Sequence, residues 1–200
     1  MTNKERILDI SFRHKLSHLG SCLTALPIIE SIYAKKRPED KVVISEGHCH
    51  LAHLVVMGSL RLVDAEQKLT ELGIHCDRRA GCDVSTGSLG QGLPIAVGMA
   101  LADGSRDVYC LVSDGELAEG SCFEALRIAE EQKLDNLKVY LNANGWGGYQ
   151  AIDVDKLEKR VKAFGFPVEI VRTNSDIGLW AVGNASHYKV ADEHLSEAKL

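Results

Sequence analysis

The chain has 200 residues, of which 28 are acidic and 23 basic, so its net charge is −5 with histidine neutral. Apolar residues make up 45% and charged residues 26%, an ordinary globular composition that excludes a mainly disordered chain. The acidic balance disfavours nucleic-acid binding, and no run approaches the roughly 18 consecutive apolar residues of a membrane helix. Residues 1–7 do not begin a secretory signal, so we expect one soluble, cytoplasmic domain over residues 1–200.

The first half of the chain is predicted to be mostly helical. Apolar residues recur at helical spacing over residues 4–16 and 23–33, with Gly20 interrupting the pattern between them. A β-branched run over 41–45 predicts a short strand. Two more helices are expected over 48–62 and 65–72, and residues 73–87 have the Gly, Cys and Asp content of a loop.

The second half alternates helices with buried strands. Residues 89–101 are small and apolar on nearly every side, which predicts a fully buried helix. Strands are expected over 107–113, 138–142, 168–172 and 178–182, and helices over 117–132, 154–164 and 193–200. This alternation favours an α/β fold with a mostly parallel sheet flanked by helices on both faces.

Six cysteines are spread along the chain without Cys-x-x-Cys spacing, and a domain of this size has little need of disulfides. Cys110 lies within an apolar strand-like run and is expected to behave as a small buried hydrophobe. We therefore predict free thiols at all six positions: Cys22, Cys49, Cys76, Cys82, Cys110 and Cys122.

Polar residues follow two of the predicted strands at the point where each ends. Asp114 comes directly after one strand, and Asn144 follows the next. Ligands of parallel sheets bind outside these carboxyl ends, and carboxylate and amide oxygens suit Mg²⁺. Gly115 would let the backbone approach a phosphate, and the amino end of the following helix would face it. A Mg²⁺-bridged diphosphate is the ligand that this pattern favours, although Asp-Gly and Asn-Gly are also common in ordinary turns.

These residues resemble a known family. Asp114-Gly115, closed by Asn144 about 30 residues later, is similar to the fingerprint of thiamine-diphosphate enzymes. The segment from Val84 to Leu93 (VSTGSLGQGL), followed by Ala96 to Ala100, closely resembles the amino-terminal half of transketolase. Further family-like segments follow in the same order: Ser17–Ser21, Ile44–His48, Gly73–His75, Gly115–Gly120 and Lys133–Leu137. The resemblance covers roughly residues 9 to 165.

The resemblance implies a Mg²⁺ site and a diphosphate site. Asp114 and Asn144 would ligate Mg²⁺ through side-chain oxygens, with the Trp146 carbonyl as a third protein ligand. Gly115 would lie against the diphosphate, and Glu116 belongs to the same cofactor-binding set. The implied cofactors are therefore thiamine diphosphate and Mg²⁺.

The resemblance also assigns residues to the coenzyme rings and to the substrate. His48 would contact the diphosphate, while His18 and His75 would face the sugar substrate, where histidine suits proton transfer near neutral pH. Backbone groups of one segment would line the aminopyrimidine and thiazolium rings: Gly87, Ser88 and Leu89.

The histidines also have simpler interpretations. His14 and His18 are spaced as a helical metal pair, but no third ligand is evident nearby. A zinc site among His48, Cys49, His50 and His53 is disfavoured because adjacent helical residues point to different faces. We therefore expect His50 and His53 to be structural.

The sequence departs from the family pattern in three places. Ser113 replaces the first glycine of the fingerprint, and the part after about residue 172 is shortened. Within that part, Ser186–Val190 resembles a late histidine segment of the family, which implies that His187 contacts substrate or diphosphate. The family also places its coenzyme between two domains, and no segment here resembles the second one, which contributes a glutamate.

We therefore interpret the chain as the amino-terminal subunit of a split transketolase, which moves a two-carbon ketol unit between sugar phosphates. Its expected partner is the carboxyl-terminal, pyrimidine-binding subunit, in a homodimer or an α₂β₂ assembly. Alone, the chain is expected to bind the coenzyme weakly and to turn over no ketose. The alternatives are the half of a pyruvate-type enzyme (deoxyxylulose-phosphate synthase or ketoacid dehydrogenase) and a non-catalytic truncated paralogue. An unrelated nucleotide-binding protein is disfavoured because GxxxxGK[ST] and GxGxxG are both absent.

Overall fold

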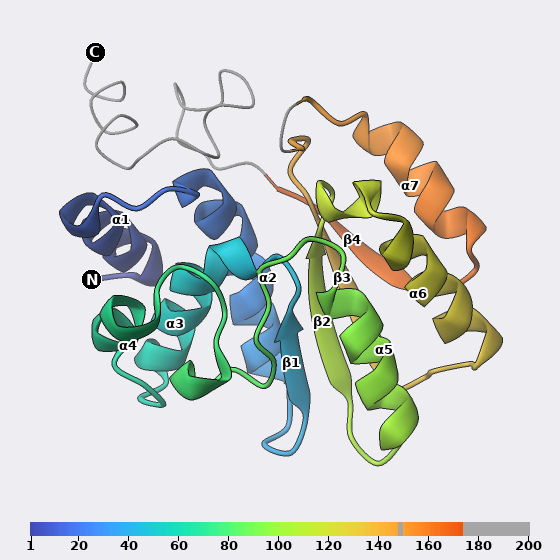
Figure 1. Cartoon of the computed structure of the whole chain (residues 1–200), viewed down its shortest axis with the longest axis horizontal. Helices are drawn as coiled ribbons and strands as arrows, with labels where there is room; N and C mark the ends of the chain where they lie inside the picture. Colours follow the sequence, from blue (N-terminus) through green and yellow to red (C-terminus); the bar gives the residue numbers. More distant parts are fainter. Residues whose placement is uncertain (148–149, 174–200) are drawn as a thin grey trace.

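The computed structural model describes residues 1–147 and 150–173 (Figure 1). Over these residues the elements follow in the order α1 (Asn3–His14), α2 (Leu19–Lys35), β1 (Lys41–Ile44), η1 (Gly47–Cys49), α3 (His50–Ser59), α4 (Ala65–Leu72), η2 (Arg78–Ala80), α5 (Gly92–Ala102), β2 (Val108–Ser113), η3 (Glu116–Ala118), α6 (Gly120–Glu131), β3 (Leu137–Ala143), α7 (Val154–Ala163) and β4 (Val168–Arg172).

The described strands form one parallel sheet in the order β1-β2-β3-β4, which confirms the predicted α/β class. Parallel pairing brings the carboxyl ends of neighbouring strands to one edge of the sheet. In the β2–β3 register, Ser113 pairs with Asn142. The residues that follow these two positions therefore leave the sheet side by side.

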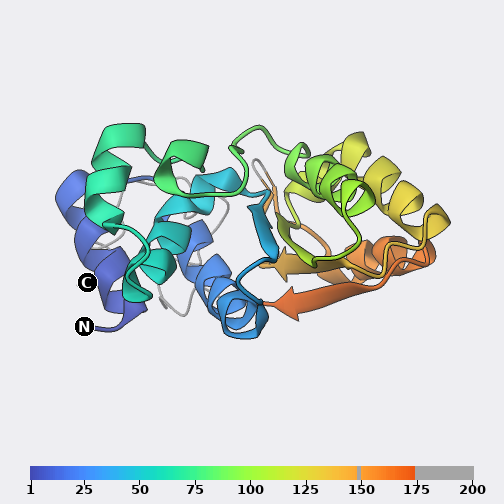
Figure 2. The same ribbon diagram turned by 90° about the horizontal axis from the view of Figure 1, so that it is seen from below.

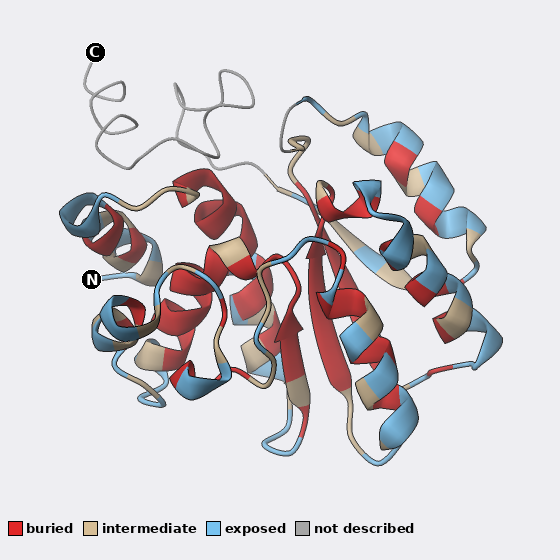
Figure 3. Cartoon of the chain, in the orientation of Figure 1, coloured by how far each residue is buried: buried red, intermediate tan, exposed pale blue. Residues whose placement is uncertain are grey.

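Helices cover both faces of the sheet, with α1–α4 on one side and α5–α7 on the other (Figures 1 and 2). Strand residues alternate between the two resulting cores, because successive side chains of a strand point to opposite faces. Val42 and Ile44 belong to the core under α1–α4, whereas Val43 belongs to the core under α5–α7. All six residues of β2 are buried, as Figure 3 shows, so it is a central strand as predicted.

The break between the first two helices is not at Gly20, as the sequence pattern suggested. Gly20 is buried within α2, and the chain turns before it, between Lys15 and His18. Both of these residues adopt left-handed backbone conformations, with φ of 50° and 63°, which end one helix and orient the next. The expected single helix over 48–62 is likewise divided into η1 and α3.

Helix α5 is not fully buried, contrary to prediction. Its packed face contacts β2 and α6, but Ile95 and Leu101 on the other face are 39% and 50% exposed. The sequence of α5 is apolar all round, so it could not predict which face of the helix is exposed. Leu89, before the start of α5, is a further exposed apolar residue, at 37%.

The predicted helices and strands otherwise agree with the structure to within a few residues, and the bounds of α4 and β4 match. The predicted strand over 178–182 and helix over 193–200 lie outside the described residues. All six cysteines are free, as expected, and all of them are buried. Among residues 1–147 and 150–173, no helix has both the length and the apolar character that a membrane span requires.

Candidate functional site

Asp114 lies at the carboxyl edge of the sheet, directly after β2, and is buried. Its Oδ1 accepts a hydrogen bond from the Gly115 amide at 2.9 Å, and its Oδ2 accepts one from the Gly145 amide at 2.6 Å. Burial raises the pKa of Asp114 to about 6, although these backbone N–H groups lower it. A cation beside this carboxylate would stabilise its ionised form and so offset the effect of burial on the pKa.

Asn144 and Trp146 come to the same place from the end of β3. The Trp146 amide donates to Oδ1 of Asn144 at 2.9 Å, which orients the side-chain amide. A Cβ at Gly115 would lie 3.5 Å from the Trp146 carbonyl oxygen, so the loops after β2 and β3 are in close contact here. The structure thus brings together Asp114, Asn144 and the Trp146 carbonyl around Gly115. Carboxylate, amide and carbonyl oxygens are a donor set that fits Mg²⁺ with diphosphate oxygens.

Three histidines gather near this edge from separate segments. The rings of His18 and His48 are tilted against each other with centroids 4.9 Å apart. Burial, and then the charge of His75, lower the pKa of His18, which therefore favours the neutral imidazole. His48 approaches the buried Glu46, with Nε2 3.9 Å from Oε2.

The segment predicted to line the coenzyme rings is held against η1. A Cβ at Gly47 would lie 2.6 Å from the Thr86 carbonyl carbon, and one at Gly87 would lie 3.0 Å from Cδ2 of His75. The Thr86 hydroxyl also donates to the Ile44 carbonyl. Ser88 and Leu89, which follow Gly87, are both exposed, so this segment is accessible to a ligand.

Glu116 has a different environment from the cofactor contact expected of it. It is fully buried, and its Oε1 accepts from the Ser45 hydroxyl at 2.7 Å and from the Gly90 amide at 3.0 Å. Its Oε2 accepts from the Ser113 amide at 3.2 Å. Burial raises its pKa, against these hydrogen bonds. The carboxylate therefore joins the segments after β1, before α5 and at the end of β2.

A third buried carboxylate at this edge, Glu46, was missed from the sequence. Asn142 at the end of β3 donates to it, with Nδ2 3.1 Å from Oε1. Burial, followed by the charge of Glu116, raises its pKa well above the usual range. Its position could have identified it, because Glu46 follows β1 at the carboxyl edge of the sheet, as Asp114 follows β2.

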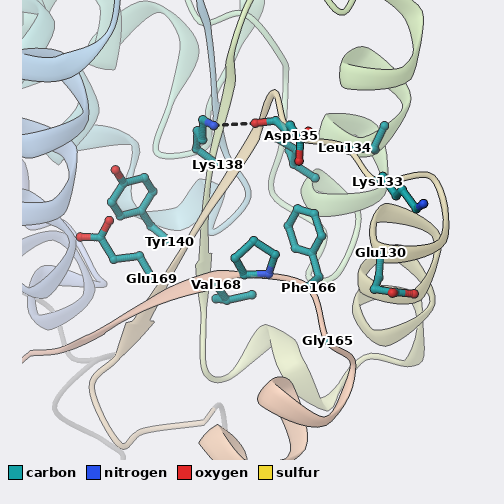
Figure 4. Close-up of a pocket in the computed structure, with 12 residues that line it drawn as sticks. Glu130, Lys133, Leu134, Asp135, Lys138, Tyr140, Gly165, Phe166, Val168 and Glu169 are labelled. Carbon is teal, nitrogen blue, oxygen red and sulfur yellow. Dashed lines mark hydrogen bonds between the residues drawn. The ribbon is translucent and has the colours of Figure 1, made fainter.

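Two further histidines named from the sequence are His14 and His187. His14 lies elsewhere, with Nε2 2.7 Å from a Glu66 carboxylate oxygen, so it forms no metal pair with His18. His187 lies outside the described residues. A hollow of about 840 Å³ lies at the opposite end of the sheet, between the amino ends of β3 and β4, and contains none of the predicted site residues (Figure 4).

The chain matches, over residues 3–189, the family described as "Transketolase, thiamine diphosphate binding domain". It belongs to the transketolase family. This agrees with the resemblance seen in the segment before α5 and in the Asp114–Asn144 spacing.

Among transketolase relatives, the chain is 29% identical to one subunit of the apulose-4-phosphate transketolase of Phocaeicola vulgatus, over 87% of this chain and 70% of that one. It is 34% identical to "6-deoxy-6-sulfo-D-fructose transketolase subunit SqwG" of a Clostridium species, over 78% of this chain and 66% of that one. Human "Transketolase" is 34% identical over 87% of this chain, which covers only 32% of the human protein. The fold matches that of transketolase from Leishmania mexicana, with a TM-score of 0.73 and 20% identity over 98% of this chain and 40% of that one.

Proposed function

We propose that this chain is the thiamine-diphosphate-binding subunit of a two-subunit transketolase that transfers a two-carbon ketol unit between sugar phosphates. The observation that carries the proposal is the meeting of Asp114, Asn144 and the Trp146 carbonyl around Gly115, in a chain of the transketolase family.

In this proposal, Mg²⁺ is held by the side chains of Asp114 and Asn144 and by the Trp146 carbonyl. Gly115 and His48 lie beside the diphosphate. The coenzyme, when bound, supplies the electron sink for carbon–carbon bond cleavage and formation. His187 is a further contact to the diphosphate or substrate, and one segment lines the coenzyme rings: Gly87, Ser88 and Leu89.

The chain's own residues then orient the substrate and handle protons. We assign His18 and His75 to the sugar hydroxyls, where a neutral imidazole can accept a proton or donate one from its other nitrogen. The low pKa of His18 supports its role as an acceptor. Glu116 is a positioning residue, because protein donors surround its carboxylate and its contact with Gly90 holds the segment before α5.

The partner is proposed to be a carboxyl-terminal, pyrimidine-binding transketolase subunit, in a homodimer or an α₂β₂ assembly. Two relatives carry the word "subunit" in their names, which supports a divided enzyme. Leu89 of the proposed coenzyme segment and Ile95 and Leu101 of the following helix α5 are exposed apolar side chains, and we propose that the second chain that completes the site covers them.

The test is reconstitution of the purified chain with a candidate carboxyl-terminal partner, thiamine diphosphate and Mg²⁺. We expect two-carbon transfer from a ketose phosphate to an aldose phosphate with both chains, and none with either chain alone. Turnover of pyruvate instead would assign the pair to another class of thiamine-diphosphate enzyme. Full activity of this chain alone would contradict the two-subunit proposal, and coenzyme binding without any turnover would indicate a non-catalytic paralogue.

A further inference from the structure

Four metal-ligating side chains meet in the interior, between α3 and the loop that follows α4. His50 and His53 lie one turn apart on α3, while Cys76 and Cys82 stand on either side of η2. All four are buried, and none exceeds 6% exposure. The proposed coenzyme site uses none of these side chains.

Two of the separations between donor atoms, both at Cys82, match those of a tetrahedral zinc site. Sγ of Cys82 is 3.6 Å from Nε2 of His50 and 3.5 Å from Nδ1 of His53. The donor atoms of His50, Cys76 and Cys82 all lie within 4.8 Å of one another, and His53, which is outside this group of three, joins it through its contact with Cys82. Zinc bonds of about 2.3 Å to sulfur and about 2.0–2.1 Å to nitrogen, at a tetrahedral angle, place N and S about 3.5–3.6 Å apart.

The outer nitrogen of each imidazole is held by a further polar group. Nδ1 of His50 lies 3.3 Å from the Gly73 carbonyl oxygen, which can only accept, so Nδ1 carries the proton and Nε2 presents its lone pair to the cluster. Nε2 of His53 lies 2.7 Å from the Tyr33 hydroxyl. Metal-bound histidines characteristically have such a second partner, which fixes the ring orientation and the tautomer.

Hydrogen bonding and metal binding place different demands on Cys82. Without a metal, its thiol donates to Nε2 of His50 and its sulfur accepts from Nδ1 of His53 when that nitrogen is protonated; a metal would instead bind the thiolate and the lone pairs of both nitrogens. Cys76 and Cys82 are free cysteines, so no disulfide links them. A divalent ion at the centre would satisfy both ring nitrogens and both sulfurs at once.

We propose that His50, His53, Cys76 and Cys82 bind one zinc ion, with all four positions of its tetrahedron taken by protein. A closed Cys₂His₂ set is the arrangement of structural zinc, because it leaves no position for a water or substrate. Cys82 also lines an open hollow of about 560 Å³, through which an ion can enter.

The place of the ion in the fold gives it a role. Cys76 directly follows His75, its amide donates to the Gly47 carbonyl at 3.2 Å, and its own carbonyl accepts from the Thr86 amide at 3.1 Å. The ion would therefore tie to α3 the loop whose backbone holds His75 and the segment leading to Gly87. It is a structural clamp beside the coenzyme site, separate from Mg²⁺.

The sequence did not predict a metal site among the residues at η1 and the start of α3 (His48, Cys49, His50 and His53). Their contacts show why. His48 lies against His18, and the Cys49 thiol donates to the Glu46 carbonyl, so these two do point away, as expected. The remaining ligands of the proposed site come from residues 76 and 82, in a spacing that matches no short zinc motif.

The first test is the metal content of the full chain, expressed without a histidine tag and purified without chelator. Elemental (inductively coupled plasma) mass spectrometry is expected to find about one zinc ion per chain. The double variant Cys76→Ala/Cys82→Ala is expected to lose it, whereas the matched control Cys110→Ala/Cys122→Ala, two buried cysteines in the other core, keeps it. Substoichiometric zinc in the wild-type chain that zinc addition does not raise, or equal zinc in both variants, would overturn the proposal.

A second test needs no variant and no enzymatic activity. Cobalt substituted into the wild-type chain is expected to show the intense visible bands of tetrahedral Co²⁺ and a thiolate-to-cobalt charge-transfer band. Removal of zinc by a chelator is expected to lower Tm and to expose residues 73–87 to protease, and Zn²⁺ but not Mg²⁺ restores both. An octahedral cobalt spectrum, or a Cys76–Cys82 disulfide in the native chain, would contradict the proposal. Neither result depends on whether the chain binds thiamine diphosphate.

Discussion

The Gly145 amide donates to Oδ2 of Asp114 across 2.6 Å, and this hydrogen bond joins the loop after β2 to the loop after β3. The two strands are paired in register up to Ser113 and Asn142, so the contact continues their alignment beyond the sheet. The proposed ligands of Mg²⁺ are thus placed by backbone geometry before any ion is bound, which lowers the cost of organising the site.

The proposed ligands can be tested by removing both side chains. Asp114→Ala with Asn144→Ala is expected to weaken binding of thiamine diphosphate at least about tenfold, or 1.4 kcal/mol, since the diphosphate loses its bridging ion. Calorimetric titration with Mg²⁺, in the presence of the partner chain, measures this. The exposed Asp135, at the far end of the sheet, supplies the control Asp135→Ala. Unchanged coenzyme binding in the double variant would refute the Mg²⁺ site.

His75 is proposed to act on the substrate, so its replacement should affect turnover more than folding. His75→Gln is expected to lower kcat/KM of the reconstituted enzyme by about 10²-fold, the usual contribution of a group that transfers protons or orients reacting hydroxyls. His14→Gln, which alters an imidazole paired with Glu66 on the surface, should leave kcat/KM within about twofold. Equal kcat/KM for the two variants would show that His75 does not act on the substrate.

Two glycines give opposite predictions for stability. A Cβ at Gly47 would lie 2.6 Å from the Thr86 backbone, so Gly47→Ala should destabilise the chain by about 1–3 kcal/mol. Gly98 lies on the exposed face of α5, and a Cβ there would meet nothing within 4 Å. Gly98→Ala should therefore stabilise by about 0.5–1 kcal/mol, because alanine is the better helix former. Urea unfolding of both variants measures the change in the free energy of unfolding. An unchanged value for Gly47→Ala would show that the segments of Gly47 and Thr86 separate easily.

Asp40 predicts an acid-dependent loss of stability. Burial raises its pKa, but hydrogen bonds from Arg37 and from the Asp107 amide outweigh burial and lower the pKa to about 2. As pH falls, Asp40 takes up a proton in the unfolded chain, at the ordinary pKa, before it does so in the folded chain. Its contribution to the free energy of unfolding is therefore complete above pH ~5 and is lost towards pH ~2.

Asp40→Asn should therefore destabilise the chain by about 1–3 kcal/mol at neutral pH, and the difference from wild type should shrink in acid. Urea unfolding at a series of pH values measures the difference, and Asp135→Asn controls for the loss of one negative charge. A difference that does not change with pH would show that the Asp40 carboxylate is not linked to stability.

The exposed apolar face of α5 gives a prediction for assembly. Ile95→Glu with Leu101→Glu is expected to weaken association with the partner at least about tenfold, because two charges would be buried at the interface. Both side chains are exposed, so the isolated chain should keep its Tm. The control, Leu60→Glu with Leu62→Glu, changes exposed leucines that follow α3. Sedimentation of the mixed chains distinguishes the pairs, and equal association would place the interface elsewhere.

The fold and the carboxyl-edge site could be anticipated from sequence because their signals are local. A buried strand is recognised by its apolar run, and Asp114 and Asn144 each follow one closely. The wrong predictions also have local causes. Helix α5 is apolar all round, so its exposed face could not be recognised, and the break before α2 depends on the backbone of Lys15 and His18 rather than on Gly20.

The order of residue types along the chain was enough to determine the alternation of strands and helices, the transketolase family and the pair of oxygen donors after β2 and β3. Only the folded chain decided that the buried Glu116 carboxylate binds Ser45 and Gly90, and that two histidines of α3 meet Cys82. Such contacts join residues 26 to 71 positions apart, and packing of whole elements brings them together, so no short pattern in the sequence specifies them.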